Sequence, residues 1–130
     1  MAESLRLETT LPASPRRIYE AWLDSKEHGA FSGGIAKINP VVGGKHSASD
    51  SYIEGVNLIL EPYKRIVQSW RTTEFPEGAA DSRLEILLDA VDGGTRLTLI
   101  QTNIPDGQTD QYEGGWRDYY FTPMAEYFAP

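Results

Sequence analysis

The alternation of hydrophobic and polar residues along the chain predicts a series of β-strands. Leu5, Leu7 and Leu11 alternate with polar residues near the N-terminus, which is the period of a half-buried strand. Comparable patterns predict further strands at about residues 44–50, 52–60, 65–71, 84–88 and 97–101. Gly93-Gly94 favours a hairpin between the last two strands, and Gly55 is expected to mark a bulge. Consecutive hairpins imply an antiparallel sheet of about five or six strands with one apolar face.

Helical spacing interrupts this alternation after the first strand. Ser14 and Pro15 are typical of a helix start, and the apolar residues that follow predict a helix over about residues 15–24. A second short helix is expected over about residues 25–31, before the Gly33-Gly34 pair. Two short helices should therefore follow the first strand.

A long helix is predicted at the C-terminus, where residues 112–128 hold seven of the chain's fourteen aromatic side chains. At about 100° per residue, one arc of this helix collects Tyr112, Trp116, Tyr119, Tyr120, Pro123 and Tyr127. This helix is the predicted element large enough to cover the apolar face of the sheet. Because Pro123 removes a backbone donor, we expect a kink there.

Composition limits the classes of protein to consider. A chain of 130 residues with 40% hydrophobic residues can bury the core of one domain, so a single domain over residues 1–130 is expected. The lack of cysteine excludes disulfides and zinc–thiolate sites. The net charge of −7 argues against binding to nucleic acid or to anionic membranes. The sequence has no signal-like or membrane-spanning stretch, so we expect a cytoplasmic protein.

Two surface features are candidates for contact with a protein partner. Residues 72–130 carry three basic and eleven acidic residues, which fits a solvated acidic surface or a docking face for a basic partner. Phe121 and Phe128 fall outside the aromatic arc, and Phe75 lies at the tip of a predicted loop. We predict that these three rings are exposed contacts for a partner or for a weak homodimer of an otherwise monomeric protein; the alternative is that they pack on their own fold.

Strand parity places Gln68, Trp70 and Gln101 on the interior face of the sheet. Polar groups in an apolar enclosure need partners, which are each other, water or a ligand. Two interpretations therefore remain open from the residues alone: a ligand cavity or a packed core.

Catalytic and metal chemistry is poorly represented. His28 and His46 are the only histidines, and no spacing of His, Asp and Glu predicts a metal site or a cofactor. His46 is either a polar anchor or base inside a cavity, or a histidine hydrogen-bonded near the start of its strand. The serines near it lack the glycine-flanked turn of a nucleophile, and the Gly-Gly pairs lack the context of a phosphate loop. No catalytic residue is predicted.

Five segments together point to a known family. They are PVVGGKHSASD, YIEGVNLILEPYKRIVQSWR, FPEG, GGTRLTLIQTNIP and GWRDYYFTPMAEYF, and the match runs over nearly the whole chain from about Leu5 to Phe128. They resemble the activator-of-heat-shock-protein-90-ATPase homologue family, part of the START-like, or helix-grip, superfamily. The chain departs from its pattern in three places. His46 lies where the family commonly has Phe, Asp50-Ser51 replaces the usual Asp-Gly turn, and Ala30-Phe31 lie where a tryptophan is often found near the end of the second helix.

The resemblance implies an α+β helix-grip fold, in which a curved antiparallel sheet of about six or seven strands wraps around the C-terminal helix. In many relatives the cavity between them takes an apolar ligand. The resemblance also implies a heat-shock-protein-90-type chaperone as partner. The eukaryotic activators carry a separate N-terminal domain as well, which we do not expect here because the first predicted strand begins at about residue 4.

We therefore predict a domain that binds a small apolar or amphipathic molecule, with chaperone binding as the alternative and cyclase-like catalysis in third place. No cofactor is expected. The residues predicted to line the cavity are Trp22, His46, Leu58, Ile66, Gln68, Trp70, Leu84, Ile86, Leu97, Leu99, Gln101, Trp116, Tyr119, Tyr120 and Tyr127.

Overall fold

The computed structural model describes residues 2–130, in which seven strands form one antiparallel sheet. The strands are β1 (Glu3–Leu11), β2 (Lys37–Ile38), β3 (Lys45–Ala48), β4 (Ile53–Glu61), β5 (Arg65–Thr72), β6 (Ser82–Val91) and β7 (Gly94–Ile104). Their order across the sheet is β1-β7-β6-β5-β4-β3-β2, so neighbouring strands pair by hairpins while β1 crosses over to pair with β7. The six strands predicted from the sequence are confirmed, and β2 adds a short edge strand.

Two short helices, α1 (Pro15–Leu23) and α2 (Ser25–Ser32), follow β1 as predicted. Ser14 caps α1, because its hydroxyl oxygen accepts the backbone N–H of Arg17 at 3.1 Å. The carboxylate of Asp24 caps α2 in the same way, through Glu27 N at 2.9 Å. Gly33 then ends α2 in the left-handed region, at φ 85°.

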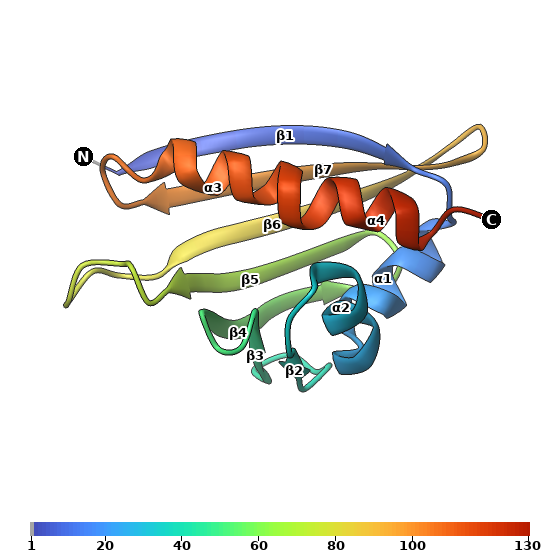
Figure 1. The fold of residues 1–130 in the computed structure, drawn as a ribbon. Coiled ribbons are helices and arrows are strands. Elements are labelled where there is room, and N and C mark those ends of the chain that lie inside the picture. The colour runs from blue at the N-terminus through green and yellow to red at the C-terminus, as the bar shows by residue number, and fades with distance from the viewer. Residues whose placement is uncertain (1) are drawn as a thin grey trace.

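The C-terminal helix has three parts, α3 (Thr109–Gly115), the π-helical segment η1 (Trp116–Phe121) and α4 (Thr122–Tyr127). Figure 1 shows them as one continuous helix that runs across a single face of the bent sheet. The helix-grip architecture expected from the sequence is thus confirmed. No helix within residues 2–130 combines the length and the apolar character needed to cross a membrane.

The π-helical segment changes which side chains of the C-terminal helix are buried. A π-helical hydrogen bond spans five residues, as from Thr122 N–H to Arg117 O, so the segment holds one residue more than an α-helix would. The buried positions after it move by one: Met124 and Phe128 are buried where Pro123 and Tyr127 were predicted. The predicted arc is therefore correct for Tyr112, Trp116 and Tyr120, and wrong for Tyr119, which is exposed, and for Pro123 and Tyr127. η1 ends two residues before Pro123, where we predicted a kink.

Phe75, Phe121 and Phe128 are all buried, so the exposed surface predicted for them is wrong. Phe75 packs against Trp70 and Tyr112, with ring centroids 6.2 and 5.9 Å away. Phe128 packs against the ring of Phe31, with 6.2 Å between the ring centroids. Phe121 is turned inward by the π-helical segment. The alternative, that these rings pack on their own fold, is the one observed.

The bulge in β4 lies three residues later than predicted. The register with β5 shifts between Asn57 and Ile59, so the bulge is at Leu58 and not at Gly55. Leu58 is consequently 43% exposed, and its predicted place in the interior is wrong. Gly55 is required for a different reason, because a Cβ there would lie 1.8 Å from the backbone oxygen of Ser69.

Candidate functional site

Two chains of hydrogen bonds join indole rings to the interior of the sheet. In the first, Trp22 Nε1 donates to Gln68 Oε1 at 3.4 Å, and Gln68 Nε2 donates to Asn57 Oδ1 at 2.8 Å. Asn57 Nδ2 in turn donates to the backbone oxygens of Asn39 and Val41. Trp22, which lies on α1, is thereby tied to β4 and β5 through side chains alone.

The second chain starts from the C-terminal helix. Trp116 Nε1 donates to Gln101 Oε1 at 2.9 Å, Gln101 Nε2 donates to Ser82 Oγ at 3.0 Å, and Ser82 Oγ donates to Trp70 O at 2.7 Å. Within residues 2–130, no buried side-chain nitrogen or oxygen lacks a hydrogen-bond partner. Gln68 and Gln101 are therefore paired with other side chains, which is the packed-core alternative at the centre of the fold.

A histidine that the sequence did not single out lies behind the C-terminal helix. His28 Nδ1 donates to Trp22 O at 2.8 Å, which leaves Nε2 to accept the hydroxyl of Tyr120, also at 2.8 Å. Burial lowers the pKa of His28 to about 4 and raises that of Tyr120, so both are neutral at pH 7. The available signal was spacing: His28 lies three residues before Phe31, on the same face of α2.

His46 is also buried, and its Nε2 lies 2.8 Å from Ser69 O across the sheet. The ring occupies the space that Gly55 leaves free, 2.6 Å from an idealised Cβ there. Burial lowers the pKa of His46. It lines a separate, more polar groove beside Lys45 and Arg71. The structure thus places it as a histidine hydrogen-bonded near the start of its strand, away from the rings of the C-terminal helix.

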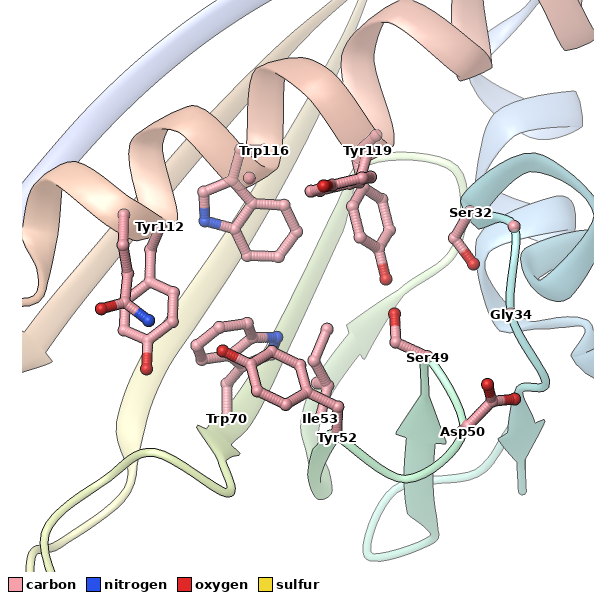
Figure 2. A pocket seen from close by; sticks show the side chains of 14 residues that line it. Ser32, Gly34, Ser49, Asp50, Tyr52, Ile53, Trp70, Tyr112, Trp116 and Tyr119 are labelled. Atoms are coloured by element: carbon pink, nitrogen blue, oxygen red, sulfur yellow. The ribbon is translucent and has the colours of Figure 1, made fainter.

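A cavity of about 430 Å³ opens between the C-terminal helix and the loops that flank β3. We call it the aromatic cavity. Figure 2 shows Tyr112, Trp116 and Tyr119 reaching into it from the helix, opposite Trp70 and Tyr52. Its lining consists of Ser32, Gly33, Gly34, Ser49, Asp50, Tyr52, Ile53, Trp70, Gln111, Tyr112, Gly115, Trp116, Tyr119 and Tyr120.

Four of the predicted cavity residues line the aromatic cavity, namely Trp70, Trp116, Tyr119 and Tyr120. Tyr119 is 67% exposed and lies at the opening, not in the interior. The other predicted residues lie elsewhere: Ile66, Leu84, Ile86, Leu97 and Leu99 are in the packed core, Trp22, Gln68 and Gln101 in the hydrogen-bond chains, His46 in the polar groove, Tyr127 half-buried against Glu27 and Leu58 at the surface.

Sequence patterns missed the wall of the cavity that is made of loops. The turn between β3 and β4 holds Ser49, Asp50 and Ser51 in the left-handed region, at φ 52°, 58° and 73°. This turn packs against the loop after α2, where a Cβ on Gly34 would lie 2.8 Å from the Cα of Ser49. The signal was the Asp50-Ser51 pair in place of the family's Asp-Gly turn, since a left-handed turn without glycine is uncommon.

Most polar groups of the aromatic cavity already have partners. Tyr52 OH donates to Glu74, and Tyr112 OH is hydrogen-bonded to Thr72 Oγ1 at 2.7 Å. Burial raises the pKa of Tyr112 to about 12. Asp50 Oδ1 accepts the backbone N–H of Ile35 at 2.9 Å. The cavity thus offers rings and an occasional hydroxyl or carboxylate, which suits binding of an apolar body.

A bent antiparallel sheet that holds a long C-terminal helix over a lateral cavity defines the helix-grip, or START-like, class of proteins. The model of the family described as "Activator of Hsp90 ATPase homolog 1-like protein" matches residues 12–129 of this chain. The chain therefore belongs to that family.

Curated relatives agree with this assignment. An activator of 90 kDa heat shock protein ATPase homolog from Dictyostelium discoideum is 31% identical over 117 residues, which are 88% of this chain and 30% of the relative. The human activator homolog 1 is 28% identical over 125 residues, 96% of this chain and 37% of the human protein. The chain thus spans about a third of the length of these relatives.

Solved structures share the fold over nearly the whole chain. The crystal structure of an HSP90 activator from Plasmodium falciparum has a TM-score of 0.85 at 23% identity, and covers 92% of this chain and 91% of that one. A protein of known structure from Chromobacterium violaceum has a TM-score of 0.79 at 26% identity, with 98% and 97% covered. These similarities support the fold.

Proposed function

We propose that this chain binds a small apolar or amphipathic molecule in the aromatic cavity. The observation that carries the proposal is an open space of about 430 Å³ lined by six aromatic rings, next to a core in which, within residues 2–130, every buried side-chain nitrogen and oxygen has a hydrogen-bond partner. That volume falls in the range of small-molecule sites, about 300–1,000 Å³. The central amides are occupied, so the ligand is held mainly by apolar contact.

Two rings of the lining, Tyr52 and Tyr119, support the same proposal because they pack against no other aromatic ring within residues 2–130. Trp70, Tyr112, Trp116 and Tyr120 pack on one another, as in the Trp70–Trp116 pair at 5.4 Å between centroids. Tyr52 and Tyr119 take part in no ring pair within residues 2–130, and Tyr119 is largely exposed at the opening. A ligand that entered the cavity would cover both and gain their contact area.

The helix offers a matched pair of glycines to test the proposal. A Cβ on Gly115 meets no atom within 4 Å, and Gly115 lines the cavity. Gly114 is equally free of neighbours but lies outside the lining. Leucine favours the helix over glycine by about 1 kcal/mol at either position. Gly115→Leu should therefore fill the cavity without destabilising the fold, and Gly114→Leu should leave the cavity open.

The experiment measures uptake of Nile red, an uncharged apolar dye, together with native mass spectrometry of freshly purified protein. We expect wild type and Gly114→Leu to bind the dye or retain an apolar compound, and Gly115→Leu to lose at least about tenfold in affinity. Equal binding by the two leucine variants, or no binding by wild type to any uncharged apolar compound in a thermal-shift panel, would refute the proposal.

A second candidate is regulation of a heat-shock-protein-90-type chaperone, which the names of the curated relatives favour. This chain spans about a third of the length of those proteins, so we only propose for it the activity that their names give to the full-length relatives. The buried Phe75, Phe121 and Phe128 do not provide the contact surface. The cytoplasmic location expected from the sequence is the one in which such a partner would be met, and it stays a prediction.

This candidate is tested by ATP hydrolysis of a purified chaperone of that class with this protein in molar excess. A changed rate that saturates with protein, and a complex in gel filtration, would support it. The Gly115→Leu variant separates the two candidates, because filling the aromatic cavity should abolish ligand binding and leave a surface contact intact. An unchanged rate and no complex would remove the chaperone role.

A further inference from the structure

The charges around the aromatic cavity are of one sign. Among the described residues that line it, Asp50 is the charged one at pH 7, and no Lys, Arg or His takes part. Glu74 lies just behind the lining, where its carboxylate accepts hydrogen bonds from Tyr52 and, at 2.8 Å, from Gln111 Nε2. A ligand in the cavity therefore meets one carboxylate directly, that of Asp50, and a second one, that of Glu74, is hydrogen-bonded to the lining residues Tyr52 and Gln111.

The basic groups nearest in sequence or contact are directed elsewhere or uncharged. Arg71 follows Trp70 on β5, but its Nη1 donates to Asp81 at 2.9 Å and to Ala79 O, and it does not line the cavity. His28 contacts Tyr120 from behind and is neutral at pH 7, because burial lowers its pKa to about 4. Negative charge in the lining is thus not neutralised by an adjacent cation.

The rings add to this asymmetry. An aromatic ring has a negative face, which attracts a cation within about 6 Å and repels an anion. Six rings line the cavity, and the faces of Tyr52 and Tyr119 are not taken up by other rings within residues 2–130. Figure 2 shows Tyr119 on the helix side of the cavity, across from the loop that carries Ser49 and Asp50. A cationic group placed there would meet both a ring face and a carboxylate.

We propose that the molecule bound in the aromatic cavity carries an amine or quaternary ammonium group on an apolar body. This inference rests on the proposed ligand-binding function and adds the charge of the ligand. The apolar body packs among Trp70, Trp116 and Ile53, and the cationic group lies at the opening between Tyr119 and Asp50. Fatty acids and other anions of the same size are disfavoured, since they would face carboxylates and ring faces without a counter-charge.

Three naphthalene probes of similar size separate charge from shape. They are 1-naphthylmethylamine, which is cationic at pH 7.5, uncharged 1-naphthylmethanol, and anionic 1-naphthoate. Isothermal titration calorimetry at physiological salt should give the amine a Kd at least about fivefold lower than the alcohol's, with naphthoate the weakest. The preference for the amine should shrink as salt is raised, because Asp50 is exposed to solvent.

Two variants with matched controls locate the effect. Asp50→Asn keeps an oxygen for Ile35 N and tolerates the left-handed backbone at φ 58°, so it should fold. It should weaken the amine about threefold and leave the alcohol unchanged, whereas Asp92→Asn, the same charge change on the β6–β7 turn, should change neither. Tyr119→Leu should also weaken the amine about threefold, and Tyr119→Phe should not.

The outcomes test the cationic charge of the ligand separately from ligand binding in the aromatic cavity. Binding of the alcohol with no preference for the amine, or naphthoate binding as tightly as the amine, overturns the cationic ligand and leaves the proposed function in place. Equal effects of Asp50→Asn and Asp92→Asn also overturn it, since the preference would then come from the net charge of −7. If none of the probes and no Nile red binds, both proposals fall.

Discussion

His28 and Tyr120 share a hydrogen bond of 2.8 Å between the imidazole Nε2 and the phenol oxygen, although 92 residues separate them in the chain. The bond joins α2 to the π-helical segment, and His28 Nδ1 extends it to the end of α1 through Trp22 O. Three helices therefore meet at one neutral histidine. Its protonation would leave Nε2 with a proton facing a hydroxyl that must then turn away.

Stability should fall with acid because of His28. Its pKa is about 4 in the folded protein and about 6.5 when unfolded, so between these values the unfolded chain binds a proton that the folded one does not. The contribution is fully present above pH 6.5 and is lost as the pH falls toward 4. Urea unfolding should give a free energy about 2 kcal/mol lower at pH 5 than at pH 7 from this group alone.

The control for this measurement is His28→Gln, which keeps a donor and an acceptor but does not titrate. Burial lowers the pKa of His46 as well, so wild type and variant share that part of the pH dependence. The difference between the two curves isolates His28. Parallel curves from pH 7 to pH 4.5 would contradict the assignment of a buried neutral imidazole at this position.

The Trp116–Gln101 hydrogen bond should show coupling in a double-mutant cycle. Gln101→Leu leaves the Trp116 N–H without an acceptor, and Trp116→Phe leaves the Gln101 oxygen without a donor. Each single change should lower the free energy of unfolding by about 1–3 kcal/mol because it leaves one buried polar group unpaired, in addition to any change in packing. The double variant should be more stable than the sum of the two losses predicts. Strict additivity in chemical denaturation would mean that the bond is not formed in solution.

Gly55→Ala should destabilise the protein by about 2–3 kcal/mol, because its methyl group would meet the Ser69 oxygen and the His46 ring. Gly114→Ala is the matched control, since it adds the same methyl group to open space in α3. That change should be neutral or should stabilise the helix by about 0.5–1 kcal/mol. The thermal midpoints of the two variants should therefore move in opposite directions. A tolerated Gly55→Ala would show that β4 and β5 do not approach as closely as described.

Two leucines test the position of the bulge in β4. Leu58 is largely exposed, so Leu58→Ser should change the unfolding free energy by less than about 0.5 kcal/mol. Leu84 is fully buried on β6, and Leu84→Ala should cost about 2–5 kcal/mol. A cost at Leu58 that approached the cost at Leu84 would place the bulge elsewhere, and would restore the regular alternation predicted from the sequence.

The fold was predictable because its signals are local. Alternation in β1, β5, β6 and β7, the Ser14 cap and the glycines after α2 each determine one element within a few residues. The errors at Leu58 and after Tyr120 have a common physical origin in one inserted residue. A bulge at Leu58 and the π-helical turn before Pro123 each shift every later position to another face, and no periodic pattern records such a shift.

The candidate site was only partly predictable for a different reason. Trp70 and Trp116 belong to regular elements, so their inward direction follows from parity and helical spacing. Asp50, Gly34 and Tyr52 belong to turns, and only the pairing of β3 with β4 brings them opposite the C-terminal helix. The same limit applies to His28: its spacing to Phe31 marks the buried face of α2, but its partner Tyr120 is distant in sequence, so no pattern reveals their hydrogen bond.

The pairing of β1 with β7 has a consequence for synthesis of the protein. Glu3 lies opposite Ile104 and Leu11 opposite Thr95, so the first strand leaves the ribosome roughly a hundred residues ahead of β7, the strand with which it pairs. At about 5–20 residues per second it waits for several seconds as an unpaired edge. Arg6 and Glu8, which alternate with its leucines, hinder pairing with other nascent chains during that interval. Closure of the sheet is therefore a late event, which needs β1 and β7 at once.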